Sequence, residues 1–376
     1  MPTNQARTSP SITAPATPRT GTPTGAMVTA GHWSSAAPLR TARSYHSATL
    51  LQDGRVLVAG GYSGPLGSVG LKTTETYDPV TNSWTDAAPM LIAHASQAAA
   101  RLADGRVLIA AGRSSAGDTT EAELYSPATN SWSRAGNLAV ARVAATAIVL
   151  STGKVLVIGG FGPAGVNPPA ELYDPTTNSW SQLPNTAAHF VDLAVSLGND
   201  KLLALGDESN WNYQFVAEYD PVANTWTPVD RPPVSLGGAV LLGSGKVLFF
   251  GNPMPGGDTR ISELYDPVVH RWSAAASMEP NGVFWQAVAL PDGRALVAGA
   301  PGSLGSLGCG SLPRCPNAEV YDPAHDSWTA TPAMAIDRGE ATLTLLSTSK
   351  VIIAGGAVPP NPDSTATAEI FDPTGS

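Results

Sequence analysis

The 376-residue sequence is poor in charged side chains and in cysteine, and it has no long apolar run. Its formal net charge is −9, whereas a nucleic-acid-binding surface needs clustered Lys and Arg, so DNA and RNA are not expected as partners. The longest apolar segments are strand-sized, well short of the roughly 18 residues of a membrane helix, so no membrane partner is expected either. Two cysteines cannot supply a disulfide framework, and the core must come from packing.

The first 26 residues lack the apolar stretch of a signal peptide and are rich in Thr, Pro, Ser and Ala. We expect residues 1–26 to be a disordered tail. The missing signal segment favours a cytoplasmic location, and the high content of Ala, Gly and Pro is typical of a GC-rich bacterial genome.

The sequence is rich in glycine and proline, which favours short strands and tight turns over helices. Tryptophan recurs at spacings of 46 to 56 residues, and a tyrosine precedes six of these tryptophans by seven residues, as in YDPVTNSW. Such a period is typical of a repeat fold. The seven periodic tryptophans are Trp33, Trp84, Trp132, Trp180, Trp226, Trp272 and Trp328.

Each repeat contains two predicted hairpins. Asp-Pro and Asn between the tyrosine and the tryptophan predict one of them, and a Gly-containing turn between apolar runs, as in HSATLLQDGRVLVAGG, predicts the other. A repeat thus holds four antiparallel strands, a to d from the inside outward. Such a sheet cannot bury both faces alone, so neighbouring sheets must stack, and radial stacking gives a propeller.

The ends of the chain share one repeat. The last repeat stops at Phe371, before its strand d, whereas Trp33 has no strand c before it. We therefore predict an all-β protein with a single seven-bladed β-propeller over residues 27–376, in which residues 30–38 supply the outer strand of the last blade. This closure leaves no unpaired inner edge.

The Gly-Gly pairs after strand b and the Tyr-to-Trp spacing resemble the kelch repeat. The pairs are Gly60-Gly61, Gly159-Gly160 and Gly355-Gly356. The resemblance implies a seven-bladed kelch propeller, but it says little about function. Kelch propellers include protein-binding adaptors, sugar-acid epimerases, nitrile specifiers and copper-radical galactose oxidases.

The end of the propeller with the long b–c loops is the expected site, because loops on a rigid scaffold usually carry binding residues. Most positions of one register at the start of strand a are Arg or His, and such a ring of cations suits an anionic or carboxylate-bearing ligand. A structural contact is the alternative interpretation. The register reads Arg43, His94, Arg142, His189, Val234, Gly282 and Arg338.

Two carboxylates depart from the repeat pattern beside these cations, namely Asp192 and Glu340. Charge compensation by neighbouring arginines is one interpretation. The other is acid–base catalysis together with His46 and His189, because a carboxylate and a histidine that face one pocket can move protons.

Aromatic residues are expected at the same end. Trp211 and Trp285 are the two tryptophans outside the period, and each either fills the core or forms a platform for a ring or a cation. Tyr45, Tyr62 and Arg113 are expected to line the same mouth.

Neither a metal nor a cofactor is expected. RSYHSATLLQDGRV is similar to segments that carry copper ligands in galactose oxidases, but the register of Tyr45 holds no second tyrosine. Cys309 and Cys315 lie in one b–c loop, where they favour a local disulfide in an oxidising environment; a zinc site would need further ligands.

Two functions remain open, and a monomer is expected for both. In the first, a cationic and aromatic pocket at the channel mouth binds an anionic or polar small molecule, with metal-independent acid–base catalysis of the isomerase, epimerase, cyclase or lyase type. In the second, a non-catalytic kelch module binds a protein or peptide through its b–c and d–a loops. The cationic register and the lack of an effector domain favour the first.

Overall fold

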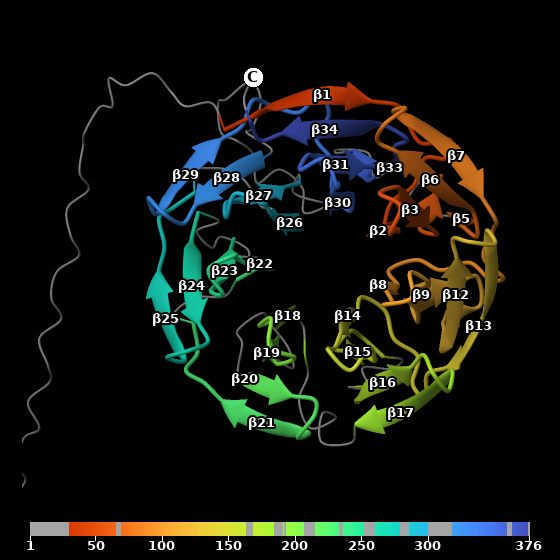
Figure 1. Cartoon of the computed structure of the whole chain (residues 1–376), viewed down its shortest axis with the longest axis horizontal. Helices are drawn as coiled ribbons and strands as arrows, with labels where there is room; N and C mark the ends of the chain where they lie inside the picture. The colour runs from red at the N-terminus through yellow and green to blue at the C-terminus, as the bar shows by residue number, and fades with distance from the viewer. Residues whose placement is uncertain are drawn as a thin grey trace, which may run out of the picture.

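The computed structural model describes residues 30–64, 69–162, 168–183, 191, 193–206, 215–232, 236–251, 260–278, 286–299, 318–358 and 363–374. Within these ranges the chain forms strands and turns and no helix, and hence no helix that is long and apolar enough to cross a membrane. The strands form seven antiparallel sheets of four strands each, arranged in a ring (Figure 1). This confirms the predicted seven-bladed propeller.

Each blade runs from the inner strand a to the outer strand d. Blade 1 contains β2 (Ser47–Leu50), β3 (Val56–Ala59), β6 (Thr74–Asp78) and β7 (Ser83–Ala87). Blade 2 contains β8 (Ala98–Arg101), β9 (Val107–Ala110), β12 (Glu121–Ser126) and β13 (Ser131–Asn137). Blade 3 contains β14 (Thr146–Val149), β15 (Val155–Ile158), β16 (Ala170–Asp174) and β17 (Ser179–Leu183).

The remaining four blades repeat this order. Blade 4 contains β18 (Leu193–Ser196), β19 (Leu202–Gly206), β20 (Phe215–Asp220) and β21 (Thr225–Pro228). Blade 5 contains β22 (Gly238–Leu241), β23 (Val247–Phe250), β24 (Ser262–Asp266) and β25 (Arg271–Ala274). Blade 6 contains β26 (Gln286–Ala289), β27 (Ala295–Ala298), β28 (Ala318–Asp322) and β29 (Ser327–Ala330). Blade 7 contains β30 (Thr342–Leu345), β31 (Val351–Ala354), β34 (Ala368–Asp372) and β1 (His32–Ala36).

Blade 7 is completed by the N-terminal strand, as predicted. β1 pairs antiparallel with β34, and Trp33 stands opposite Phe371 with ring centroids 5.1 Å apart. The two ends of the chain therefore build one sheet, which joins the first blade to the last. Residues 1–29, and with them the predicted tail, lie outside the described part of the chain.

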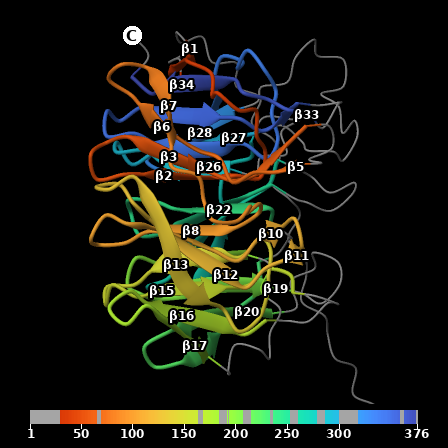
Figure 2. The same ribbon diagram turned by 90° about the vertical axis from the view of Figure 1, so that its right-hand side faces the viewer.

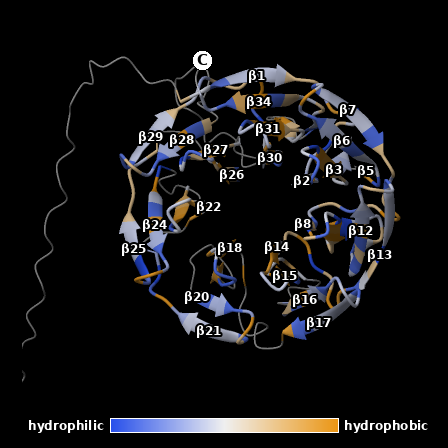
Figure 3. Cartoon of the chain, in the orientation of Figure 1, coloured by the Kyte–Doolittle hydropathy of each residue, from blue (hydrophilic) through white to orange (hydrophobic). Residues whose placement is uncertain are grey.

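The core lies between the blades, on the second strand of each sheet. Every residue of β3, β9, β15, β23, β27 and β31 is buried, because both faces of these strands pack against side chains. Hydrophobic residues accordingly gather on the inner strands, such as β22 and β31, whereas the outer strands are paler in Figure 3. The Val- and Leu-rich b strands thus supply the apolar surface that makes neighbouring blades stack.

The periodic Tyr and Trp close the outer hairpin of each blade. Tyr77 stands opposite Trp84 with ring centroids 5.0 Å apart, and the Tyr77 hydroxyl donates to Oδ1 of Asn82 at 2.9 Å. Asn82 has φ of 48°, a left-handed conformation that Asn tolerates better than most residues. Nε1 of Trp84 donates to the carbonyl of Ala37, before the blade begins. The repeated sequence thus encodes both the turn and a contact to the preceding chain.

Small hairpins mark one end of the ring. β4 (Tyr62–Ser63) pairs with β5 (Val69–Gly70), β10 (Arg113–Ser114) with β11 (Gly117–Asp118), and β32 (Ala357–Val358) with β33 (Asp363–Ser364). Figure 2 shows β5, β10, β11 and β33 on the same side of the ring. We call this side the loop end. Because the strands are antiparallel, the turns between strands c and d lie at the opposite end.

Candidate functional site

Three arginines at the start of strand a are buried and paired inside their own blades. NH2 of Arg43 lies 2.7 Å from Oε1 of Glu75, and NH1 donates to the carbonyl of Gly60 at 2.7 Å. Arg142 with Glu171, and Arg338 with Glu369, repeat the ion pair at 2.7 Å. All three arginine side chains are 0% exposed.

Each glutamate also fixes the backbone that leads into strand a. Oε2 of Glu75 accepts the N–H of Arg40 at 2.7 Å, and Oε1 accepts the N–H of Thr41 at 3.1 Å. Burial lowers the pKa of Arg43, while the charge of Glu75 and the hydrogen bond to it act in the opposite direction. The arginine–glutamate pair therefore holds the d–a connection against strand c.

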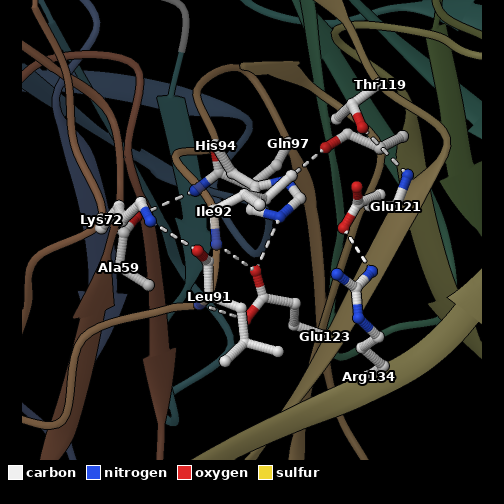
Figure 4. A network of polar contacts seen from close by, with 11 residues as sticks. Ala59, Lys72, Leu91, Ile92, His94, Gln97, Thr119, Glu121, Glu123 and Arg134 are labelled. Carbon is white, nitrogen blue, oxygen red and sulfur yellow. Dashed lines mark hydrogen bonds and ion pairs between the residues drawn. The ribbon is translucent and has the colours of Figure 1, made fainter. Parts of the chain in front are cut away.

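His94 takes the place of the arginine in blade 2 (Figure 4). Its Nδ1–H donates to the carbonyl of Ala111 at 2.7 Å, and Nε2 lies 3.3 Å from Oε1 of Glu123. Glu123 accepts the N–H groups of Leu91 and Ile92 at 2.8 and 3.0 Å. The imidazole thus repeats the two contacts of a guanidinium, one to a carbonyl after strand b and one to the glutamate.

This placement corrects the expectation that Arg43, His94, Arg142 and Arg338 present cations to a ligand. Each side chain is fully buried, and each already has a carboxylate partner within its blade. The alternative interpretation, a structural contact, describes them. His189, at the same register, lies outside the described residues.

His46 is also buried and does not face a ligand. Its side chain contacts blade 7, where Nε2 lies 3.0 Å from the hydroxyl of Thr342. Burial, together with the charge of Arg43, lowers the pKa of His46 to about 3, so the ring is neutral at physiological pH. The predicted catalytic role of His46 is therefore not supported by its position.

The residues two positions after the Arg43 register connect neighbouring blades through their backbones. The N–H of Tyr45 donates to the carbonyl of Glu340, that of Ser96 to Tyr45 and that of Ala144 to Ser96, at 3.2, 2.9 and 2.9 Å. All four residues have φ between 52° and 57°. A left-handed conformation costs roughly 1–2 kcal/mol for such residues, and the hydrogen bonds between blades hold them in it.

Tyr45 and Glu340 form a side-chain pair across the junction of blades 1 and 7. The backbone N–H of Tyr45 donates to the carbonyl of Glu340 at 3.2 Å, and the phenol and the carboxylate lie close enough for each to shift the pKa of the other. Burial, followed by the charge and hydrogen bond of Glu340, raises the pKa of Tyr45 to about 12. Burial also raises the pKa of Glu340, and the hydrogen bond from Tyr45 opposes this shift. Tyr45 remains 42% exposed, whereas Glu340 beside it is partly buried.

Tyr62 and Arg113 lie beside this pair on the small hairpins. The rings of Tyr45 and Tyr62 are 6.1 Å apart at 75°, an edge-to-face arrangement. Nε of Arg113 lies 2.7 Å from Oδ1 of Asp118. Burial raises the pKa of Tyr62, and the charge of Arg113 opposes this shift. The structure thus brings together Tyr45, Tyr62, Glu340 and Arg113, which were all predicted for one mouth.

Gly61 makes this approach possible. It has φ of 92°, and a Cβ at this position would lie 2.5 Å from the carbonyl of Ser44. Without a side chain, the chain after strand b can bridge back to the start of strand a, where Ser44 pairs with Tyr62. Tyr62 is thereby brought against Tyr45.

The other predicted site residues cannot be placed. Asp192, His189, Trp211, Trp285, Cys309 and Cys315 lie outside the described residues. Within the part of the chain that is described, no three His, Cys, Asp or Glu side chains gather in a way that could hold a metal ion.

The fold defines a propeller built of seven four-stranded repeats. The family model of the kelch motif matches residues 42–91 and 142–186. The chain is a seven-bladed β-propeller that carries kelch motifs in these residues.

No curated protein sequence matches the chain, whereas 745 chains of solved structures do. One of them is a fungal alcohol oxidase of the AA5 family in complex with copper, which is 19% identical with a TM-score of 0.72. The match covers 92% of this chain and 76% of the oxidase. At this identity the likeness shows the fold alone.

Proposed function

We propose that this propeller binds a polar small molecule at its loop end, against Tyr45, Tyr62 and Glu340. The observation that carries the proposal is the Tyr45–Glu340 pair, an exposed phenol and a partly buried carboxylate from two blades with an aromatic ring beside them. A few convergent polar groups beside exposed aromatic surface are typical of ligand sites.

The repeats supply an internal control. Tyr45 and Glu340 share their backbone conformation and hydrogen-bond pattern with Ser96 and Ala144. A short side chain therefore satisfies the fold at this register, and a tyrosine next to a glutamate is not needed for it. Residues that depart from a repeat without a structural reason are candidates for function.

Of the two ligand types expected from the sequence, a polar molecule is favoured over an anionic one. The buried arginines are neutralised by glutamates at 2.7 Å, and Arg113 by Asp118 at the same distance. In acid–base chemistry of the isomerase, epimerase, cyclase or lyase type, Glu340 would accept the proton, since burial raises the pKa of its carboxyl.

A thermal-shift screen against sugars, polyols, sugar acids, amino acids and amines tests the proposal. The variants Tyr45→Ala and Glu340→Ser introduce residue types that the same register already accepts at Ala144 and Ser96, so both should fold. Val80→Ala, at an 88% exposed residue of the opposite end, is the control. A stabilising ligand that acts on the wild type and the control but not on the two variants supports the site. A ligand that stabilises all four proteins equally contradicts it.

Protein binding through the loops is the second candidate. Phe161, which follows β15 at the loop end, is 48% exposed, and exposed aromatic side chains are enriched in protein interfaces. A photo-crosslinking residue at position 161, with one at position 80 as the control, tests this candidate. A defined partner captured at 161 alone, and released by excess unlabelled protein, would favour it over the small-molecule site.

A further inference from the structure

Several charged side chains of the described loop end have a partner of opposite charge. Arg43, Arg142 and Arg338 each lie 2.7 Å from a buried glutamate, and Arg113 lies 2.7 Å from Asp118. His46 is neutral at physiological pH. Within the described residues, no basic side chain forms an ion pair with Glu340, which lies beside Tyr45 where the Tyr45 N–H donates to its carbonyl at 3.2 Å.

From this arrangement we infer that the ligand group recognised at the loop end is an organic cation, a primary amine or a quaternary ammonium, held between the Glu340 carboxylate and the ring of Tyr45. The inference rests on the proposed function, because it names the ligand class of the same site. It replaces the anionic ligand that the Arg and His register suggested.

The aromatic geometry fits a cation. A cation over the face of an aromatic ring, within about 6 Å of its centroid, is attracted by the ring quadrupole. Tyr62 meets Tyr45 at 75° and 6.1 Å, so the two rings are not stacked face to face. Tyr45 keeps 42% of its surface exposed. An ammonium group can therefore lie against Tyr45 while the carboxylate of the neighbouring Glu340 balances its charge.

A neutral ligand would leave this carboxylate without a counterion. A partly buried carboxylate that gains a cation within about 4–6 Å is stabilised in its charged form. The Arg113–Asp118 pair beside Tyr62 contributes no net charge, so it does not oppose an incoming cation. The charge of the site thus selects against carboxylates and phosphates.

The test compares choline with its neutral carbon isostere, 3,3-dimethylbutan-1-ol, by saturation-transfer NMR and calorimetric titration. Tetramethylammonium and n-butylammonium serve as further cationic probes. We expect the cations to bind the wild type at least about tenfold more tightly than the isostere. Glu340→Gln keeps the size of the side chain and should remove this preference for cations. Tyr45→Ala should also weaken the binding of the cations. Val80→Ala should bind as the wild type does.

The outcomes separate the inference from the proposed function. Equal binding of choline and the isostere, or an unchanged preference in Glu340→Gln, overturns the inference. If a neutral or anionic compound binds and is lost in Tyr45→Ala while no cation binds, the site stands and its ligand class is wrong. If Tyr45→Ala changes the binding of no compound of any class, both the inference and the proposed function are wrong. Glu340→Ser, with the residue type of Ser96, shows whether a lost response reflects misfolding.

Discussion

The guanidinium of Arg43 and the carboxylate of Glu75 lie 2.7 Å apart and are both buried, although one begins blade 1 and the other lies on its third strand. Removing one partner of such a pair leaves an uncompensated buried charge, which costs about 3–5 kcal/mol. We predict that Glu75→Gln and Arg43→Met each lower the free energy of unfolding by this amount, measured by chemical denaturation. Asp104→Asn, which breaks the half-exposed pair with Arg106, should change it by less than about 1 kcal/mol.

The double variant Arg43→Met/Glu75→Gln checks the physical reason. Without either charge, the penalty of a lone buried ion disappears, so the double variant should be more stable than the sum of the single losses predicts. Additive losses would mean that the two side chains do not act as a pair.

His94 acts as a shorter substitute for this arginine. It contacts the carbonyl of Ala111 and the carboxylate of Glu123, as Arg43 contacts Gly60 and Glu75. We predict that His94→Arg lowers the unfolding free energy by no more than about 1–3 kcal/mol, the usual cost of enlarging a buried side chain, because the arginine can keep both contacts. His94→Ala should cost more than His94→Arg, because it leaves Glu123 buried without its partner. Equal losses in the two variants would contradict this role.

Glu263 is the corresponding glutamate of blade 5, where the sequence has Val234 in place of the arginine. Burial raises the pKa of Glu263 above its ordinary value. The ionised carboxylate therefore destabilises the folded protein above its folded-state pKa, and this cost disappears below the unfolded-state value near 4.5, where both states are protonated. We predict that Glu263→Gln raises the melting temperature at pH 7 and loses this advantage at pH 4. A lower melting temperature at pH 7 would contradict it.

A comparison of alanine substitutions at Gly61 and Gly153 distinguishes the cost of a steric clash from the cost of a left-handed backbone. Both have positive φ, 92° and 79°, but a Cβ on Gly61 would lie 2.5 Å from the carbonyl of Ser44, whereas nothing lies within 4 Å of one on Gly153. Gly153→Ala should cost roughly 1–2 kcal/mol from the left-handed backbone alone. Gly61→Ala should cost about 1–3 kcal/mol more, because the bridge to Ser44 must shift. Equal costs in thermal unfolding would contradict the close approach.

The fold could be predicted because the sequence of each repeat indicates its own strands and turns. The Tyr-to-Trp spacing encodes the outer hairpin, and the split between Trp33 and Phe371 reveals which strand closes blade 7. The prediction is specific because a pattern that recurs seven times in one chain is improbable by chance.

The role of the arginines could not be predicted from their register alone. A position at the start of strand a does not say whether its side chain points toward solvent or toward strand c. The useful signal was a glutamate two residues before the aromatic residue on strand c, as in Glu75 and Tyr77, which recurs wherever Arg43 has a described counterpart. A buried charge requires a partner, so the arginine register and the glutamate register together predict the ion pair.

Glu340 could be singled out because it departs from the repeat, and Tyr45 and Tyr62 were expected at the same mouth, but the contact between Tyr45 and Glu340 could not be predicted. The two residues occupy the same register in blades 7 and 1, and the sequence separates them by almost the entire chain. Only closure of the ring brings them together.

The ionisation of Glu340 tests the account of this site most directly. Its carboxyl carbon can be followed by ¹³C NMR of glutamate-labelled protein, assigned by the signal lost in Glu340→Gln. We predict a pKa above the ordinary 4.5 in the free protein, a further rise in Tyr45→Phe, which removes the hydrogen bond, and a fall when choline is added. An ordinary pKa that responds to neither Tyr45→Phe nor choline would contradict the account.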